Sequence, residues 1–274
     1  MLTILAEAAL RSLLLGSVVW LGLNLLRVRN PNAHKTAWVL VLMASLSMPL
    51  LMHWSTVTVT VHALPAPAPE RLIPAEPLLP KSRRAAPPLE QRIAEASPNH
   101  SYIANADWWE IATVIYWLIA ALLLARLVLG FQLTWRLARA ATPIREHWVA
   151  DRDVRVSSAI NGPVTFGSTI LVPPAFANWD STKRLAVLAH ESAHIANRDF
   201  YVLLLASLNR VLFWFSPFAW WQLARLAELA EIISDDRAIE ILADRVSYAE
   251  VLLDLVQARR EGLPGWKWQG SALS

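Results

Sequence analysis

The sequence has no cysteine and few charged residues. Without cysteine among the 274 residues, disulfide bonds and thiolate ligands are excluded, so a bound metal must be held by histidine, aspartate or glutamate. Charged residues make up 17% of the chain and apolar residues 55%, whereas soluble domains carry about 25% charged residues. This composition is typical of a membrane protein. Arginines flank apolar runs and form no single basic stripe, which argues against direct binding of nucleic acid.

Three apolar runs are long enough to cross a bilayer, which takes about 20 helical residues. They cover Leu5 to Leu26, Thr36 to Trp54 and Trp108 to Trp135, and tryptophans stand at several of their ends, as expected at the headgroup level. The N-terminus lacks a basic region and a cleavage site of small residues, so we expect the first run to be a retained span and not a signal peptide.

The distribution of basic residues predicts the orientation of these spans. Lysine and arginine are concentrated in the loop 27–35 and directly after the third run, and such residues favour the cytoplasmic side. The N-terminus and segment 55–107 are therefore predicted to be extracytoplasmic, in a bacterial inner membrane. Segment 55–107 contains nine of the 17 prolines and no glycine. It is predicted to be an extended external loop that serves as a spacer or binds a partner.

Beyond residue 136 the pattern changes to that of a folded α+β domain. The stretch VRVSSAINGPVTFGSTILVPP predicts two short strands around a turn at Asn161-Gly162. The stretch STKRLAVLAHESAHIANRD predicts a helix with Ser181 as its N-cap. Within this helix, His190 and His194 are four residues apart and project from one face, about 40° from each other. They can bind one Zn²⁺, with Glu191 as the base that accepts a proton from the attacking water.

A third ligand has to come from elsewhere, and the carboxylate-rich run LAELAEIISDDRAIEILADR is the candidate. Glu231 and Asp235 lie on one helix face, with Glu228 one turn earlier. The alternative is a solvated acidic face that pairs with neighbouring arginines. Asp199, directly after the histidine helix, could orient a histidine or pair with Arg198 or another neighbouring arginine.

The apolar stretch FYVLLLASLNRVLFWFSPFAWWQLARL separates the histidines from these carboxylates. A single crossing of the membrane would place Glu231 on the opposite side from the histidines, and the stretch is too short for two full crossings. Pro217 should break the helix. We therefore predict a hairpin of two half-length helices, in or beneath the membrane, that returns Glu231 to the histidines.

Successive blocks of the chain resemble the BlaR/MecR-type membrane metallopeptidases, the antirepressor proteases of bacterial β-lactam sensing. These blocks are NGPVTFGSTILVPP, LAVLAHESAHIANRD, FWFSPFAWW and EIISDDRAI. The resemblance implies a gluzincin-like (zincin) site in which His190, His194 and Glu231 hold zinc and Glu191 is the general base. Asp235 would either support a ligand or be an additional one. Ser234 stands where that family usually has cysteine.

Together these features predict a mainly α-helical integral membrane protein. Its parts would be two spans (1–54), the external loop (55–107), a third span (108–135), a cytoplasmic zinc domain with a hydrophobic helical hairpin (136–261) and a tail (262–274). The predicted function is a zinc endopeptidase in signal transduction that cleaves a transcriptional repressor or itself, with a homodimer as a further candidate assembly. The alternatives are a scaffold protein with a structural metal and a quality-control protease for membrane proteins.

Overall fold

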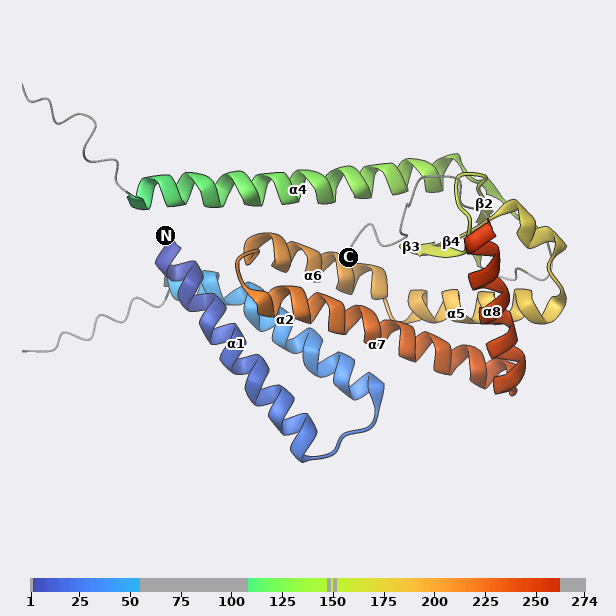
Figure 1. Ribbon diagram of the computed structural model, residues 1–274, viewed down its shortest axis with the longest axis horizontal. Coiled ribbons are helices and arrows are strands. Elements are labelled where there is room, and N and C mark those ends of the chain that lie inside the picture. Colours follow the sequence, from blue (N-terminus) through green and yellow to red (C-terminus); the bar gives the residue numbers. More distant parts are fainter. Residues whose placement is uncertain (1, 55–107, 147–148, 150–151, 262–274) are drawn as a thin grey trace, which may run out of the picture. The chain divides into compact units, whose positions relative to one another are not determined.

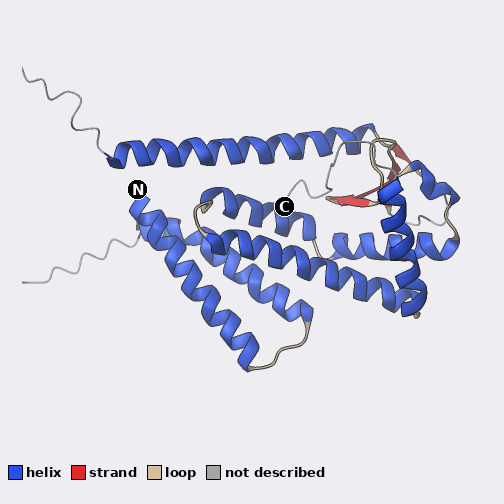
Figure 2. Ribbon diagram, viewed as in Figure 1, coloured by secondary structure: helices blue, strands red, loops and turns tan. Residues whose placement is uncertain are grey.

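The computed structural model describes residues 2–54, 108–146, 149 and 152–261, and the chain in it is mostly helical (Figures 1 and 2). The proline-rich segment 55–107 and the tail 262–274 lie outside the described residues. The chain divides into two units, residues 1–54 with 115–274 and residues 55–114. The features discussed below lie in the first unit, apart from residues 108–114 at the start of the third long helix.

Three long helices correspond to the three apolar runs. They are α1 (Leu2–Leu25), α2 (Pro31–Trp54) and α4 (Trp108–Ala140). Among the described residues, α1 and α4 are long and apolar enough to cross a membrane. Only 28% and 17% of their most apolar windows are buried, whereas the core helix of a soluble protein would be covered. Helix α2 is not among these two, so the second span remains a prediction.

Helix α2 differs from the other two because it packs closely against α6 (Asp199–Leu212) and α7 (Pro217–Leu242). Polar contacts accompany this packing. Ser45 donates to Asn209 at 3.0 Å, and Gln222 donates to the Trp38 carbonyl at 3.3 Å. Buried polar groups that are hydrogen-bonded favour one relative position of two packed helices. These contacts therefore fix the position of α2 on the hairpin. The apolar part of this interface comprises Trp38, Val41, Leu42, Ala206, Leu223, Leu226 and Leu229.

The predicted hairpin is present, with its turn between α6 and α7 and Pro217 at the first position of α7. Proline is tolerated there because the N–H that it lacks would have no partner in the helix. The expectation of two half-length helices is wrong for the second one. Helix α7 has 26 residues and continues without a break through Glu231 and Asp235.

A small sheet has the strand order β1-β2-β4-β3. Its strands are β1 (Thr142–Pro143), β2 (Asp153–Val156), β3 (Val164–Phe166) and β4 (Thr169–Val172). Strands β2 and β4 are parallel, and the other neighbours are antiparallel. Strands β2 and β3 lie on either side of Asn161-Gly162, as predicted, but they do not pair with each other, and the same stretch holds a third strand, β4. A hairpin joins β3 to β4 at Gly167, whose φ of 62° favours glycine, and β3 forms an edge of the described sheet.

Helix α5 (Ser181–Ala196) follows a 3₁₀ turn, η2 (Pro174–Asn178), and packs against β3, α7 and α8 (Arg245–Glu261). Its N-cap is Asp180, whose carboxylate accepts from the Lys183 N–H at 2.8 Å, and not the predicted Ser181. The buried core under α5 includes Ile170, Val172, Phe176, Ala186, Val187, Leu188 and Val251. This packing fixes the rotation of α5, so its histidines face α7 and its glutamate faces the sheet.

Candidate metal centre

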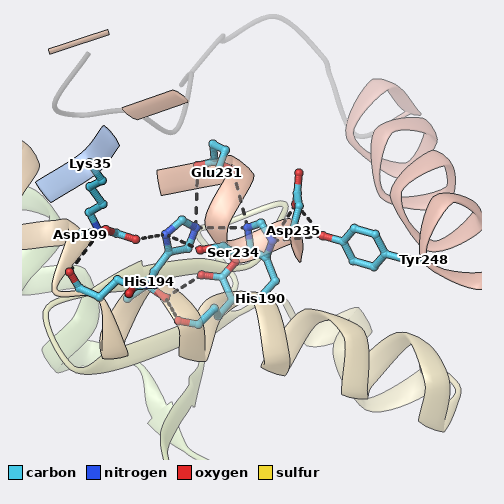
Figure 3. A network of polar contacts seen from close by, with 11 residues as sticks. Lys35, His190, His194, Asp199, Glu231, Ser234, Asp235 and Tyr248 are labelled. Atoms are coloured by element: carbon cyan, nitrogen blue, oxygen red, sulfur yellow. Dashed lines mark hydrogen bonds and ion pairs between the residues drawn. The ribbon is translucent and has the colours of Figure 1, made fainter. Parts of the chain in front are cut away.

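The two histidines of α5 lie side by side and point toward α7 (Figure 3). Their Nε2 atoms are 3.2 Å apart, and the side chains of His190 and His194 are 17% and 14% exposed. The four-residue spacing on a helix explains this arrangement. Both rings are therefore mostly buried, but neither is closed off from solvent.

Glu231 of α7 brings a carboxylate to the same point. Its Oε2 is 3.6 Å from Nε2 of His190, and its Oε1 is 3.8 Å from Nε2 of His194. The donor atoms of the three residues all lie within 4.8 Å of one another. Glu228, the other candidate on this helix, instead forms an ion pair with Arg225 at 2.6 Å. The hairpin therefore returns Glu231, and not Glu228, to the histidines.

The spacing of these donors fits a metal ion. Two nitrogens in a tetrahedral zinc site, each about 2.0–2.1 Å from the ion, stand about 3.3–3.4 Å apart. The two Nε2 atoms are 3.2 Å apart. The Nδ1 atom of each ring faces a carboxylate, so in a neutral ring the proton is on Nδ1. Both Nε2 atoms then carry lone pairs, which face each other and the carboxylate of Glu231. A cation between them resolves this conflict.

Asp235 lies on the far side of His190. Its Oδ1 is 3.0 Å from Nδ1 of His190 and accepts from the Tyr248 hydroxyl at 2.7 Å. Tyr248 also lies 3.1 Å from that Nδ1. Of the two roles that the sequence left open for Asp235, this geometry is that of a group supporting His190. A carboxylate in this position fixes the orientation of the ring, as it does beside histidines that bind metals.

Hydrogen bonds and charges around this pair shift its pKa values. Burial lowers the pKa of His190, but the hydrogen bond with Asp235 and the charges of Glu191, Asp235 and Glu231 outweigh it, so the net shift is upward. Burial raises the pKa of Asp235, yet its hydrogen bonds with His190 and Tyr248 bring the net value below the ordinary one. Burial and Asp235 raise the pKa of Tyr248, which stays a donor. The negative charges that favour a proton on His190 would also favour a bound cation.

Asp199 supports the other histidine. Its Oδ2 is 2.7 Å from Nδ1 of His194, and the Ser234 hydroxyl lies 3.1 Å from the same nitrogen. The sequence left open whether Asp199 orients a histidine or pairs with Arg198, and the structure places it on His194. Its cationic partner is Lys35 of α2. Sequence reasoning missed this contact because Lys35 and Asp199 are 164 residues apart.

Glu191 faces the sheet and is 8% exposed. Its Oε2 accepts from the hydroxyl of Thr165 in β3 at 2.6 Å, and the same hydroxyl lies 3.2 Å from the Glu191 carbonyl oxygen. No local pattern marks Thr165, which is one of several threonines in β-rich sequence. Its contact arises from the packing of β3 on α5 and holds the Glu191 carboxylate in one orientation.

Comparison with known proteins agrees with this architecture. The model of the family described as BlaR1 peptidase M56 matches residues 3–271. The chain is also 27% identical over 110 residues to the regulatory protein BlaR1 of Bacillus licheniformis, a match that covers 38% of this chain and 18% of that protein. The resemblance found in the sequence blocks is thereby confirmed. Because the family match extends over nearly the whole chain, from the first helix through the histidine motif and the hairpin, the protein belongs to the BlaR1 peptidase M56 family.

Proposed function

We propose that this protein is a membrane-embedded zinc endopeptidase. The convergence of His190, His194 and Glu231 on one point, with Glu191 held beside them, is the observation that carries the proposal. Membership of a peptidase family supports it. These residues are the donor types that zinc prefers in hydrolases of the His-Glu-x-x-His class.

His190, His194 and Glu231 would hold the ion, and Asp235 and Asp199 would fix the two rings through their Nδ1 atoms. Bound Zn²⁺ supplies a Lewis acid that polarises the scissile carbonyl and makes water more acidic. The Glu191 carboxylate takes the proton of the attacking water and delivers it to the leaving amine. Thr165 orients that carboxylate through its 2.6 Å hydrogen bond.

The membrane arrangement that we propose has three spans, α1, α2 and α4, in the bacterial inner membrane. The basic residues of the α1–α2 connection and of the end of α4 support a cytoplasmic position for both. The zinc domain would then be cytoplasmic, with the α6–α7 hairpin packed on α2 at the membrane.

We propose that an extended substrate pairs with strand β3. Strand β4 lies inside the sheet between β2 and β3 and therefore offers no free edge. Strand β3 has one side free in the described sheet and carries Thr165, so a peptide added there would run beside Glu191. The family resemblance makes a cytoplasmic repressor, or the chain itself, the proposed substrate. A purely structural metal would not need the buried, oriented Glu191.

Removal of metal is the experiment that tests the proposed function. We expect the full chain, purified in detergent, to contain about one zinc per molecule, as a three-ligand site of this class binds a single ion. Cleavage of an unfolded protein substrate should stop after treatment with a chelator and return when zinc is restored. Zinc-free protein that still cleaves, or protein that binds no zinc, would contradict the proposal.

The substitution Thr165→Val should lower kcat without loss of zinc. It removes a hydrogen bond to the carboxylate of Glu191, and a bond to a charged group contributes about 1.5–3 kcal/mol, which corresponds to a decrease of about 10- to 100-fold. The matched control is Thr169→Val, because Thr169 lies in the neighbouring strand and donates to Asp153 at 2.7 Å. Equal kcat values for the two variants would argue against a role of Thr165 in catalysis.

A further inference from the structure

Lys35 and Asp199 form a buried ion pair next to the metal centre (Figure 3). Lys35 is 8% exposed and Asp199 is 3% exposed. Burying an unpaired charge is costly, so each of the two groups needs the other. Arg198 is next to Asp199 in the chain but is exposed, and the cation that neutralises the carboxylate comes from α2.

The two carboxylate oxygens of Asp199 contact different partners. Oδ1 contacts Nζ of Lys35, and Oδ2 lies 2.7 Å from Nδ1 of His194. The lysine therefore holds the carboxylate in an orientation in which the second oxygen accepts the N–H of the ring. Such outer partners fix the tautomer of a ligand histidine and strengthen its other nitrogen as a donor.

Lys35 has a second contact with the same region. Its Nζ donates to the carbonyl of Asn197 at 3.2 Å, and Asn197 is the C-cap of α5. A cation at this end of a helix is favoured by the free carbonyls and the helix dipole. One ammonium group thus holds both the end of the histidine helix and the carboxylate that orients His194.

Helix α2 is itself held in register on the hairpin by the contacts of Ser45 with Asn209 and of Gln222 with the Trp38 carbonyl. Lys35 is in the second turn of this helix. Its ammonium group therefore reaches Asp199 only when α2 is correctly packed on α6 and α7.

We propose that Lys35 is a positioning residue for the metal centre, which acts through Asp199 on His194 and makes α2 part of the scaffold that sets metal affinity. This inference rests on the proposed zinc site. It assigns the lysine no contact with substrate or metal.

The test measures zinc dissociation constants by chelator competition on the full chain in detergent, with the absorption spectrum of the Co²⁺ form as a report on ligand geometry. Lys35→Met should weaken zinc about 10- to 100-fold, the usual effect of losing an outer partner of a ligand, and should change the Co²⁺ spectrum. The matched control is Lys183→Met, because Lys183 pairs at 3.3 Å with Asp254, which is 64% exposed, and touches no ligand. Its zinc affinity should equal that of the wild type.

A double-mutant cycle with Asp199→Asn shows whether the lysine acts through the carboxylate. The double variant Lys35→Met/Asp199→Asn should bind zinc no more weakly than Asp199→Asn alone, because the carboxylate through which Lys35 acts on His194 is already absent. The double variant leaves no unpaired buried carboxylate. It can therefore be compared with Asp199→Asn even when Lys35→Met alone fails to fold. A further loss in the double variant would overturn the inference.

The outcomes for the inference and for the proposed function are separable. If the wild type binds zinc and folded Lys35→Met binds it equally well, with the same Co²⁺ spectrum, Lys35 has only a structural role and the inference is wrong. The conclusion is the same if Lys35→Met lowers the unfolding temperature but leaves zinc affinity and the Co²⁺ spectrum unchanged. If the wild type itself binds no zinc, the proposed function and the inference are both overturned.

Discussion

Replacing Glu191 by glutamine should abolish proteolysis while zinc stays bound. An amide cannot accept the proton of the attacking water, and loss of a general base costs about 10²- to 10⁴-fold in rate. The change keeps the size of the side chain, and its amide oxygen can still accept the hydrogen bond from Thr165. The measurement is kcat for cleavage of a protein substrate, together with zinc content, on the detergent-purified chain.

The matched control for this change is Glu240→Gln, the same substitution on an exposed residue of α7. Glu240 is 68% exposed and pairs with Arg237 at 2.6 Å, and exposed pairs contribute about 0–1 kcal/mol. The control should keep full activity. If Glu191→Gln cleaves as fast as the control, then Glu191 is not the base. If the wild type and both variants bind zinc but none of them cleaves, a scaffold with a structural metal becomes the better description. The cleavage products also distinguish the two kinds of protease. One defined product indicates a dedicated substrate, and broad cleavage indicates a quality-control protease for membrane proteins.

The parts of the site that lie close together in sequence could be predicted, because local geometry decides them. Two histidines four residues apart on a helix must share a face, and Pro217 must interrupt a helix. The hairpin followed from Pro217 together with the need to bring a third ligand back to the histidines. The choice between Glu228 and Glu231 could not be made from spacing alone, since both lie on the same amphipathic helix. The rotation of α7 against α5 makes that choice, and it depends on packing along the whole hairpin.

The residues that sequence reasoning missed all act across long separations. Lys35 reaches Asp199 over 164 residues, Tyr248 reaches His190 over 58, and Thr165 reaches Glu191 over 26. Each looked ordinary in its own segment. Lys35 was counted among the basic residues that set orientation, although its side chain is buried. The sheet was predicted incompletely for a related reason. Asn161-Gly162 has strong turn chemistry, but no local pattern shows that β2 pairs in parallel with β4 or that the hairpin lies at Gly167.

The arrangement of the polar groups divides the site into two halves with different supports. His190 is held by Asp235 and Tyr248, which belong to α7 and α8, within the folded domain. His194 is held by Asp199, whose cation comes from α2. The first half therefore depends on the packing of α5, α7 and α8, whereas the second depends also on how α2 packs.

Replacing Glu231 by alanine should remove most of the bound zinc. Glu231 supplies the only carboxylate within the three-residue cluster found among the described residues, so the variant leaves two histidines to hold the ion. The loss in affinity should exceed the about 10- to 100-fold seen when an outer partner is removed. Its side chain is 64% exposed, so its truncation leaves no cavity. The variant should unfold at the temperature of the wild type when both are compared without metal.

Glu228→Ala is the control that makes this result specific to one carboxylate. Glu228 stands one turn earlier on the same helix, is 58% exposed and pairs only with Arg225 among the described residues. Its removal should leave one zinc per chain and full activity. Zinc lost in Glu231→Ala and kept in Glu228→Ala would establish both the third ligand and the hairpin that delivers it. Zinc kept in both variants would mean that the ligand comes from another residue, and Asp235, beside His190, would be the first to replace.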